Sequence, residues 1–157
     1  LESIMTNYYE IISSQLGSQL NDRPGFGAAG GLGFGISAFI NSELKSGINI
    51  VLDALNFNQY LLDADLVITG EGRIDSQSER GKAPIGVIKY ANQLNCKVIV
   101  IAGSVDDPKT FNQKFNVTNS YGIVNAKFSI EKAFEDPYGC LKSVSQKAAE
   151  DFKVLVT

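Results

Sequence analysis

One stretch, from Asp65 to Pro84, constrains the fold of this chain most strongly. It reads DLVITGEGRIDSQSERGKAP and begins with an apolar, β-branched run that is typical of a buried strand. Gly70 and Gly72 then break the run, and charged residues crowd the segment until an apolar helical pattern resumes at Pro84. Open α/β sheets bind ligands beyond the carboxyl ends of their strands. The stretch therefore predicts a strand, a polar loop that carries a binding site, and a helix.

The rest of the second half continues this alternation of strands and helices. Residues 97–102 form a continuous apolar run, as expected for a strand that is covered on both faces. The expected elements, in chain order, are strand 65–69, helix 84–94, strand 97–102, a short helix from 108, strand 121–124, one or two turns over 130–134 and helix 137–156. This order predicts an α/β fold with a parallel sheet and right-handed crossovers.

The first part of the chain has a mainly helical pattern. Apolar residues at helical spacing predict a helix over 2–20, and a glycine-rich loop, 25–35, leads into a second, amphipathic helix. Residues 48–63 are interpreted as mostly helical, although their first apolar piece also fits a strand. The change of pattern near residue 63 indicates a boundary between domains or subdomains.

Composition narrows the class of protein. The 157 residues, 44% of them hydrophobic, suffice for one globular domain or the greater part of one. The net charge of −3 argues against a nucleic-acid surface, and no apolar run approaches the roughly 20 residues of a membrane span. Cys96 and Cys140 do not make a disulfide framework, so we interpret them as reduced thiols of a cytoplasmic protein. Histidine is absent, so acid–base chemistry falls to other side chains.

Two glycine motifs match familiar phosphate-binding patterns only in part. Residues 25–30 spell G-x-G-x-x-G, but a helix rather than a strand precedes them, which argues against a dinucleotide site. Either these small residues allow close helix packing or their amides hold an anion, and the sequence favours neither. Gly81-Lys82 is not a P-loop, because Ala83 stands where a magnesium-binding hydroxyl is needed.

The charged residues after the first strand could form a site. Glu71 and Asp75 could bind magnesium, or one of them could take a proton from a substrate hydroxyl. Arg73 and Lys82 could bind a carboxylate or phosphate. Turn formation, a surface ion pair and a solvated lysine explain the same residues without a ligand. Secondary candidates follow the next strand and would lie at the same sheet edge: Ser104, Asp106 and Asp107.

Several blocks of sequence together carry a family resemblance. They are residues 27–33 (GAAGGLG), 64–75 (ADLVITGEGRID), 77–78 (QS), 81–84 (GKAP), 86–87 (GV) and 101–105 (IAGSV). Their order and spacing resemble the glycerate kinase family, whose bacterial members use ATP to phosphorylate glycerate. The resemblance implies an enzyme with ATP and Mg²⁺ as cofactors and glycerate as its small-molecule substrate, giving phosphoglycerate.

The resemblance also implies that this chain is a C-terminal fragment of a two-domain α/β kinase whose active cleft lies between the domains. Residues 64–157 would complete a Rossmann-like or flavodoxin-like domain that lacks its first strands. Residues 1–63 would belong to an inserted second α/β domain. Such a fragment is expected to be inactive alone and to self-associate through an exposed sheet edge or apolar face. The alternative is a non-catalytic α/β module that binds a small carboxylate or phosphate.

The resemblance further implies roles for individual residues. The catalytic candidates are Asp75, Glu71 and Lys82, with Asp75 the preferred base and the two carboxylates the candidate Mg²⁺ ligands. The substrate-binding candidates are Arg73, Ser78, Gly70 and Gly72. The candidates for binding an anion or phosphate through backbone amides are Gly27, Gly30, Gly31 and Gly33.

Overall fold

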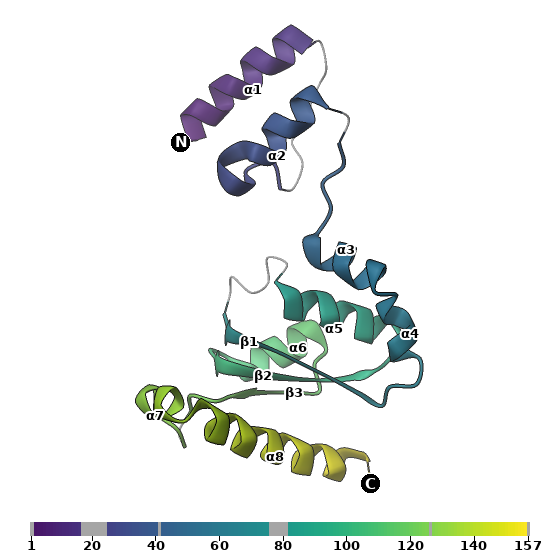
Figure 1. Ribbon diagram of the computed structural model, residues 1–157, viewed down its shortest axis with the longest axis vertical. Helices are drawn as coiled ribbons and strands as arrows, with labels where there is room; N and C mark the ends of the chain where they lie inside the picture. The colour runs from purple at the N-terminus through teal and green to yellow at the C-terminus, as the bar shows by residue number, and fades with distance from the viewer. Residues whose placement is uncertain (1, 17–24, 41, 76–81, 126, 157) are drawn as a thin grey trace. The chain divides into compact units, whose positions relative to one another are not determined.

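The computed structural model describes residues 2–16, 25–40, 42–75, 82–125 and 127–156. The chain forms two compact units, Leu1–Lys45 and Ser46–Thr157, and each is described by itself (Figure 1). Across the described ranges, no helix has both the length and the apolar character needed to cross a membrane.

The first unit consists of two helices, α1 (Glu2–Leu16) and α2 (Ala28–Phe39). Helix α1 confirms the predicted helix as far as residue 16, and residues 17–20 of that prediction lie outside the described ranges. The core between the helices is aromatic: the rings of Tyr8, Tyr9 and Phe26 each lie within 5.6 Å of the ring of Phe34, measured between centroids.

Helix α2 starts inside the segment that was predicted to be a loop. Its first turn is distorted, because Ala29, Gly30 and Gly31 have left-handed φ angles of 51°, 69° and 93°. A Cβ atom at Gly31 would collide with the side chain of Met5 on α1. A glycine at position 31 thus allows a left-handed backbone conformation that residues with a side chain disfavour, and it also allows the two helices to approach closely.

The second unit is built on a three-stranded parallel sheet in the order β1 (Leu66–Ile74), β2 (Lys97–Val105) and β3 (Asn119–Gly122). Both crossovers carry a helix, so the α/β class and the parallel pairing predicted from the sequence are confirmed.

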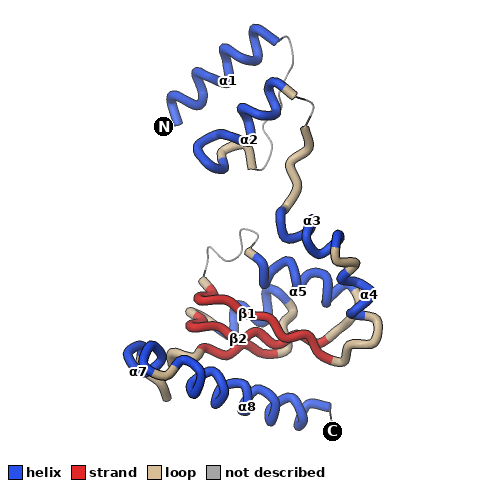
Figure 2. The backbone as a smooth tube through the Cα atoms, in the orientation of Figure 1, coloured by secondary structure: helices blue, strands red, loops and turns tan. Residues whose placement is uncertain are grey.

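Helices cover both faces of the sheet (Figure 2). Helices α5 (Ala83–Gln93) and α6 (Pro108–Phe115) lie on one face, and α8 (Pro137–Val156) lies on the other, preceded by the short helix α7 (Ile130–Glu135). The main core forms between the sheet and α5, from buried side chains that include Val67, Ile85, Ile88, Val98 and Val100.

Helices α3 (Gly47–Ala54) and α4 (Phe57–Leu61) confirm the helical interpretation of residues 48–63. Both pack against α5, and Gly86 of α5 lies so close to Ile48 of α3 that an added Cβ atom would collide with it. The boundary between the compact units therefore precedes α3, whereas the change of sequence pattern lies near residue 63.

The first strand is longer than predicted, since β1 continues through Gly70 and Gly72 to Ile74. The prediction that these glycines break the strand is wrong. A Cβ atom at Gly70 would collide with the carbonyl oxygen of Ile101, and one at Gly103 would collide with that of Gly72. Gly70 and Gly103 thus allow the strands to approach closely, and Glu71 and Arg73 belong to the strand rather than to a loop.

Candidate functional site

Polar side chains gather where β1 and β2 end. Arg73 lies opposite Ser104 in the parallel register, and the amide of Asp106 donates a hydrogen bond of 3.1 Å to the carbonyl of Ile74. The two strands therefore end side by side, with Asp106 at this edge, whereas Glu71 lies further back in β1, opposite Ala102. This edge is where parallel α/β sheets bind their ligands.

Arg73 and Asp106 form a two-pronged ion pair across this edge. Arg73 Nε lies 3.2 Å from Oδ1 of Asp106, and Nη2 lies 2.9 Å from Oδ2. The hydrogen bond to Asp106, followed by the charge of Asp106, raises the pKa of Arg73. Asp75 approaches from the same strand, with Oδ2 3.8 Å from Nε of Arg73. The guanidinium thus lies between two carboxylates, and its side chain is 62% exposed.

Lys82 and Glu71 form the second ion pair. Lys82 lies at the N-cap of α5 and its Nζ is 2.5 Å from Oε1 of Glu71. The hydrogen bond to Glu71 raises the pKa of Lys82, so the ammonium stays charged across the neutral range. Their side chains are 39% and 20% exposed, which leaves the lysine reachable by a ligand. Glu71 is thus engaged with a cation, as Asp75 is with Arg73.

A hollow of about 270 Å³ lies beside these pairs, between the end of β1 and α6. Its lining includes Asp75, Asp106 and Asp107. Asp107 has a structural role, because its carboxylate accepts a hydrogen bond of 3.1 Å from the amide of Thr110 and caps α6. The same contact lowers the pKa of Asp107. Asp75 and Asp106 are the carboxylates of this hollow that do not cap the helix.

The fit of this edge to a divalent cation is partial. Within the described ranges, no three carboxylate, thiol or imidazole groups are placed to hold a metal ion. Magnesium is commonly held by one or two carboxylates together with phosphate oxygens and water. All three carboxylates already contact a cation, Asp106 and Asp75 through Arg73 and Glu71 through Lys82, so a Mg²⁺ ion here would be held mainly by phosphate oxygens and water.

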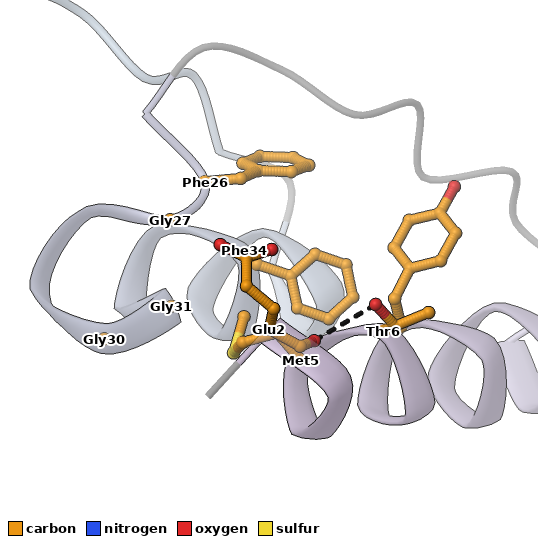
Figure 3. Close-up of a pocket in the computed structure, with 9 residues that line it drawn as sticks. Glu2, Met5, Thr6, Phe26, Gly27, Gly30, Gly31 and Phe34 are labelled. Atoms are coloured by element: carbon orange, nitrogen blue, oxygen red, sulfur yellow. Dashed lines mark hydrogen bonds between the residues drawn. The ribbon is translucent and has the colours of Figure 1, made fainter.

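The glycine-rich segment lines a different pocket, of about 430 Å³, within the first unit (Figure 3). Gly27, Gly30 and Gly31 contribute to its wall. Gly33 does not line it, because this residue packs against the carbonyl of Gly25, where an added Cβ atom would lie within 2.8 Å. Aromatic rings, Met5 and Thr6 make up most of the rest, and the charged residue among those that line the pocket is an acid, Glu2. An anion here would depend on backbone amides alone.

The remaining substrate-binding candidates are divided. Ser78 lies outside the described residues. Gly70 is paired with Ile101 inside the sheet, whereas Gly72 lines an apolar hollow near α7. Sequence reasoning ranked Asp106 second, although it makes the principal contact of Arg73. The signal for Asp106 in the sequence was its position directly after β2, but its pairing with Arg73 depends on the register of the two strands.

Known proteins match this chain along nearly its whole length. Residues 1–153 match the model of the glycerate kinase family. The chain is 40% identical to glycerate 2-kinase of Escherichia coli over 95% of its own length, and 38% identical to glycerate kinase of Bacillus subtilis over all of it. A crystal structure assigned by name to glycerate kinase 2 of Salmonella typhimurium LT2 superimposes with a TM-score of 0.67 and 37% identity, over 97% of this chain.

The chain spans only part of each of these proteins: 39% of the E. coli kinase, 41% of the B. subtilis kinase and 39% of the Salmonella chain. The resemblance that the sequence motifs carried is confirmed by the extent of these matches. The chain belongs to the glycerate kinase family.

Proposed function

We propose that this chain supplies part of the active cleft of an ATP-dependent glycerate kinase, which transfers the γ-phosphoryl group of ATP to a hydroxyl of glycerate. The observation that carries this proposal is the pair of cations, Arg73 and Lys82, held at the carboxyl edge of the sheet by carboxylates 2.5 to 3.2 Å away. Phosphoryl transfer needs chiefly positioning and neutralisation of charge, and this arrangement provides groups for both.

Arg73 and Lys82 bind the anionic groups in this proposal. One of them holds the carboxylate of glycerate and the other the transferring phosphoryl group, because both cations are partly exposed at one edge. Glu71 keeps Lys82 oriented rather than acting as the base. The amides of the glycine segment, at Gly27, Gly30 and Gly31, are a separate candidate anion contact within the first unit.

Asp75 is the proposed base for the glycerate hydroxyl. Its side chain is 22% exposed, lines the hollow between β1 and α6, and lies 3.8 Å from Arg73. When bound, Mg²⁺ would neutralise charge on the phosphate oxygens and would be held mainly by those oxygens and by water. Asp75 would take the hydroxyl proton as the oxygen attacks phosphorus, a role that typically contributes about 10²- to 10⁴-fold to the rate.

A coupled assay of ADP release tests this function on the natural gene product that carries the sequence. Glycerate-dependent release of ADP supports it, and a purified, folded product that releases none refutes it. Replacing glycerate with lactate, which lacks one hydroxyl, is the matched substrate control.

A second candidate is a non-catalytic module that binds a small carboxylate or phosphate. Such a module would need only the partly exposed cations at the sheet edge, Arg73 and Lys82, and no catalytic base. Calorimetric titration of the chain with glycerate and with ATP separates the two functions. Binding of glycerate by a product that never turns over favours the module.

A further inference from the structure

A second hollow lies at the carboxyl edge of the sheet, separate from the hollow that Asp75 and Asp106 line. Its volume is about 340 Å³. It is lined by Gly72, Gly103, Ser104, Ile123, Val124, Ile130, Ala133, Phe134 and Pro137. All of these residues are uncharged, so the hollow differs in character from the one that Asp75 and Asp106 line. Figure 1 shows α7 at the ends of the strands, where α8 begins.

Helix α7 contributes apolar side chains to this hollow rather than to a core. None of its residues is buried, and Ile130 and Phe134 are 54% and 82% exposed. Neither side chain belongs to the core clusters of the described chain. An aromatic ring and a branched side chain that face a hollow in this way offer flat and apolar contact area to an occupant.

Gly72 provides a second, independent observation. A Cβ atom at Gly72 would meet nothing within 4 Å, and its φ angle is not left-handed. Neither sheet packing nor backbone conformation therefore requires a glycine here, in contrast to Gly103, whose Cβ would collide with Gly72 itself. The space that Gly72 leaves empty belongs to the hollow, and its neighbours in the chain are Glu71 and Arg73.

We propose that this hollow receives the purine base of the nucleotide, with Phe134 against the ring and the phosphates directed toward Arg73 and Lys82. This inference rests on the proposed kinase function. The volume of the hollow lies within the range of small-molecule pockets, about 300 to 1,000 Å³. Its position matches the crevice in which parallel α/β sheets bind nucleotides. Arg73 follows Gly72 directly in β1, so its side chain leaves the strand on the opposite face, and a bound triphosphate would cross the carboxyl edge of the sheet to reach it.

Two variants of the natural gene product test the assignment, one by filling the hollow and the other by removing part of its wall. Gly72→Val fills the hollow with a side chain that strands favour, and Phe134→Ala removes an exposed wall. Tyr138→Ala is the matched control, because Tyr138 is an aromatic residue near α7 that is 77% exposed and does not line the hollow. The affinities of ATP and of inorganic tripolyphosphate are measured by calorimetry.

Both test variants should weaken ATP binding about tenfold or more, since apolar contacts and stacking of a base are lost. Tripolyphosphate binding should stay unchanged in all three variants, and ATP binding should stay unchanged in Tyr138→Ala. Equal weakening of ATP and tripolyphosphate would overturn the assignment, because the lost contacts would then not belong to the base.

Unchanged ATP affinity in both test variants would also overturn it. ATP binding that depends on the hollow, without glycerate-dependent ADP release, would support the base site while refuting the kinase function. Failure of the unaltered protein to bind ATP would refute both.

Discussion

Arg73 and Asp106 face each other across the carboxyl ends of neighbouring strands, with Nε and Nη2 of the arginine 3.2 and 2.9 Å from the two carboxylate oxygens. Residues 33 positions apart in the chain thus meet through the parallel register of β1 and β2. The two hydrogen bonds hold the plane of the Arg73 guanidinium. The proposed kinase function depends on that orientation.

Replacement of Asp106 by Asn should therefore reduce glycerate phosphorylation. The amide keeps the shape of the side chain but loses its charge, so Arg73 is held less firmly. We expect kcat/KM for glycerate to fall about ten- to a hundredfold, in line with the cost of small misplacements. The unfolding temperature should change little, because the pair is exposed. Steady-state kinetics with glycerate and with ATP varied in turn check this, and an unchanged kcat/KM would remove Asp106 from the positioning role.

Replacement of Asp75 by Asn tests the proposed base. Turnover should fall about 10²- to 10⁴-fold, while the far-ultraviolet circular dichroism and the unfolding temperature stay close to those of the unaltered protein. Asp107→Asn is the matched control in the same hollow, since asparagine caps a helix as well as aspartate does. Equal loss of turnover in both variants would indicate a general effect on the hollow rather than a base.

Two glycines of the sheet edge should respond oppositely to an added methyl group. Gly103→Ala places a Cβ atom against the carbonyl of Gly72 and should destabilise the fold by about 1–3 kcal/mol. Gly72→Ala meets open space, and alanine restricts the unfolded chain more than glycine does, so stability should be unchanged or rise by up to about 1 kcal/mol. Urea unfolding of the two variants compares them directly. Equal destabilisation would show that the edge around Gly72 is packed rather than open.

Tyr121 should make the fold sensitive to alkali. Burial, followed by its hydrogen bond to Asp151, raises the pKa of Tyr121 from 10.0 to about 12. A raised pKa in the folded state stabilises the fold fully below the pKa of the unfolded chain, and this stabilisation is lost as the pH rises from about 10 toward 12. Tyr121→Phe should lower stability at neutral pH and flatten its decline in this range. Urea unfolding at several pH values measures the slope, with Tyr138→Phe as an exposed control.

Periodic apolar patterns predicted most elements of the second unit. The strand at Lys97 and the helices that begin at Ala83 and Pro137 follow from runs long enough to bury one face, and the structure confirms them. The sequence pattern did not predict where β1 ends. Gly70 and Gly72 have low strand propensity, and they continue the strand only through their contacts with β2. That information belongs to the pairing of the two strands and is absent from either segment alone.

The candidate site shows the same limit. The sequence predicted that Asp106 lies at the same sheet edge as Glu71, but Glu71 lies within β1, opposite Ala102, rather than after the end of the strand. The partners within that edge depend on register and side-chain length, so the pairing of Glu71 with Lys82 could not be predicted. In the first unit, the close approach of the Met5 side chain to Gly31 is a contact between helices that local sequence does not encode.

The free edge of the sheet leads to a last prediction, self-association of the chain when it is produced alone. Among the described strands, β1 pairs on one side only, with β2, and Ile68 within it is 61% exposed. Parallel sheets are normally covered on both faces, and an unpaired strand with an exposed isoleucine is a surface on which a second strand can add.

Light scattering over a range of concentrations should show dimers or larger species. Ile68→Lys should shift the chain toward monomer, because a charged side chain at the edge opposes pairing. A chain that stays monomeric at every concentration would show that this edge is closed without a partner.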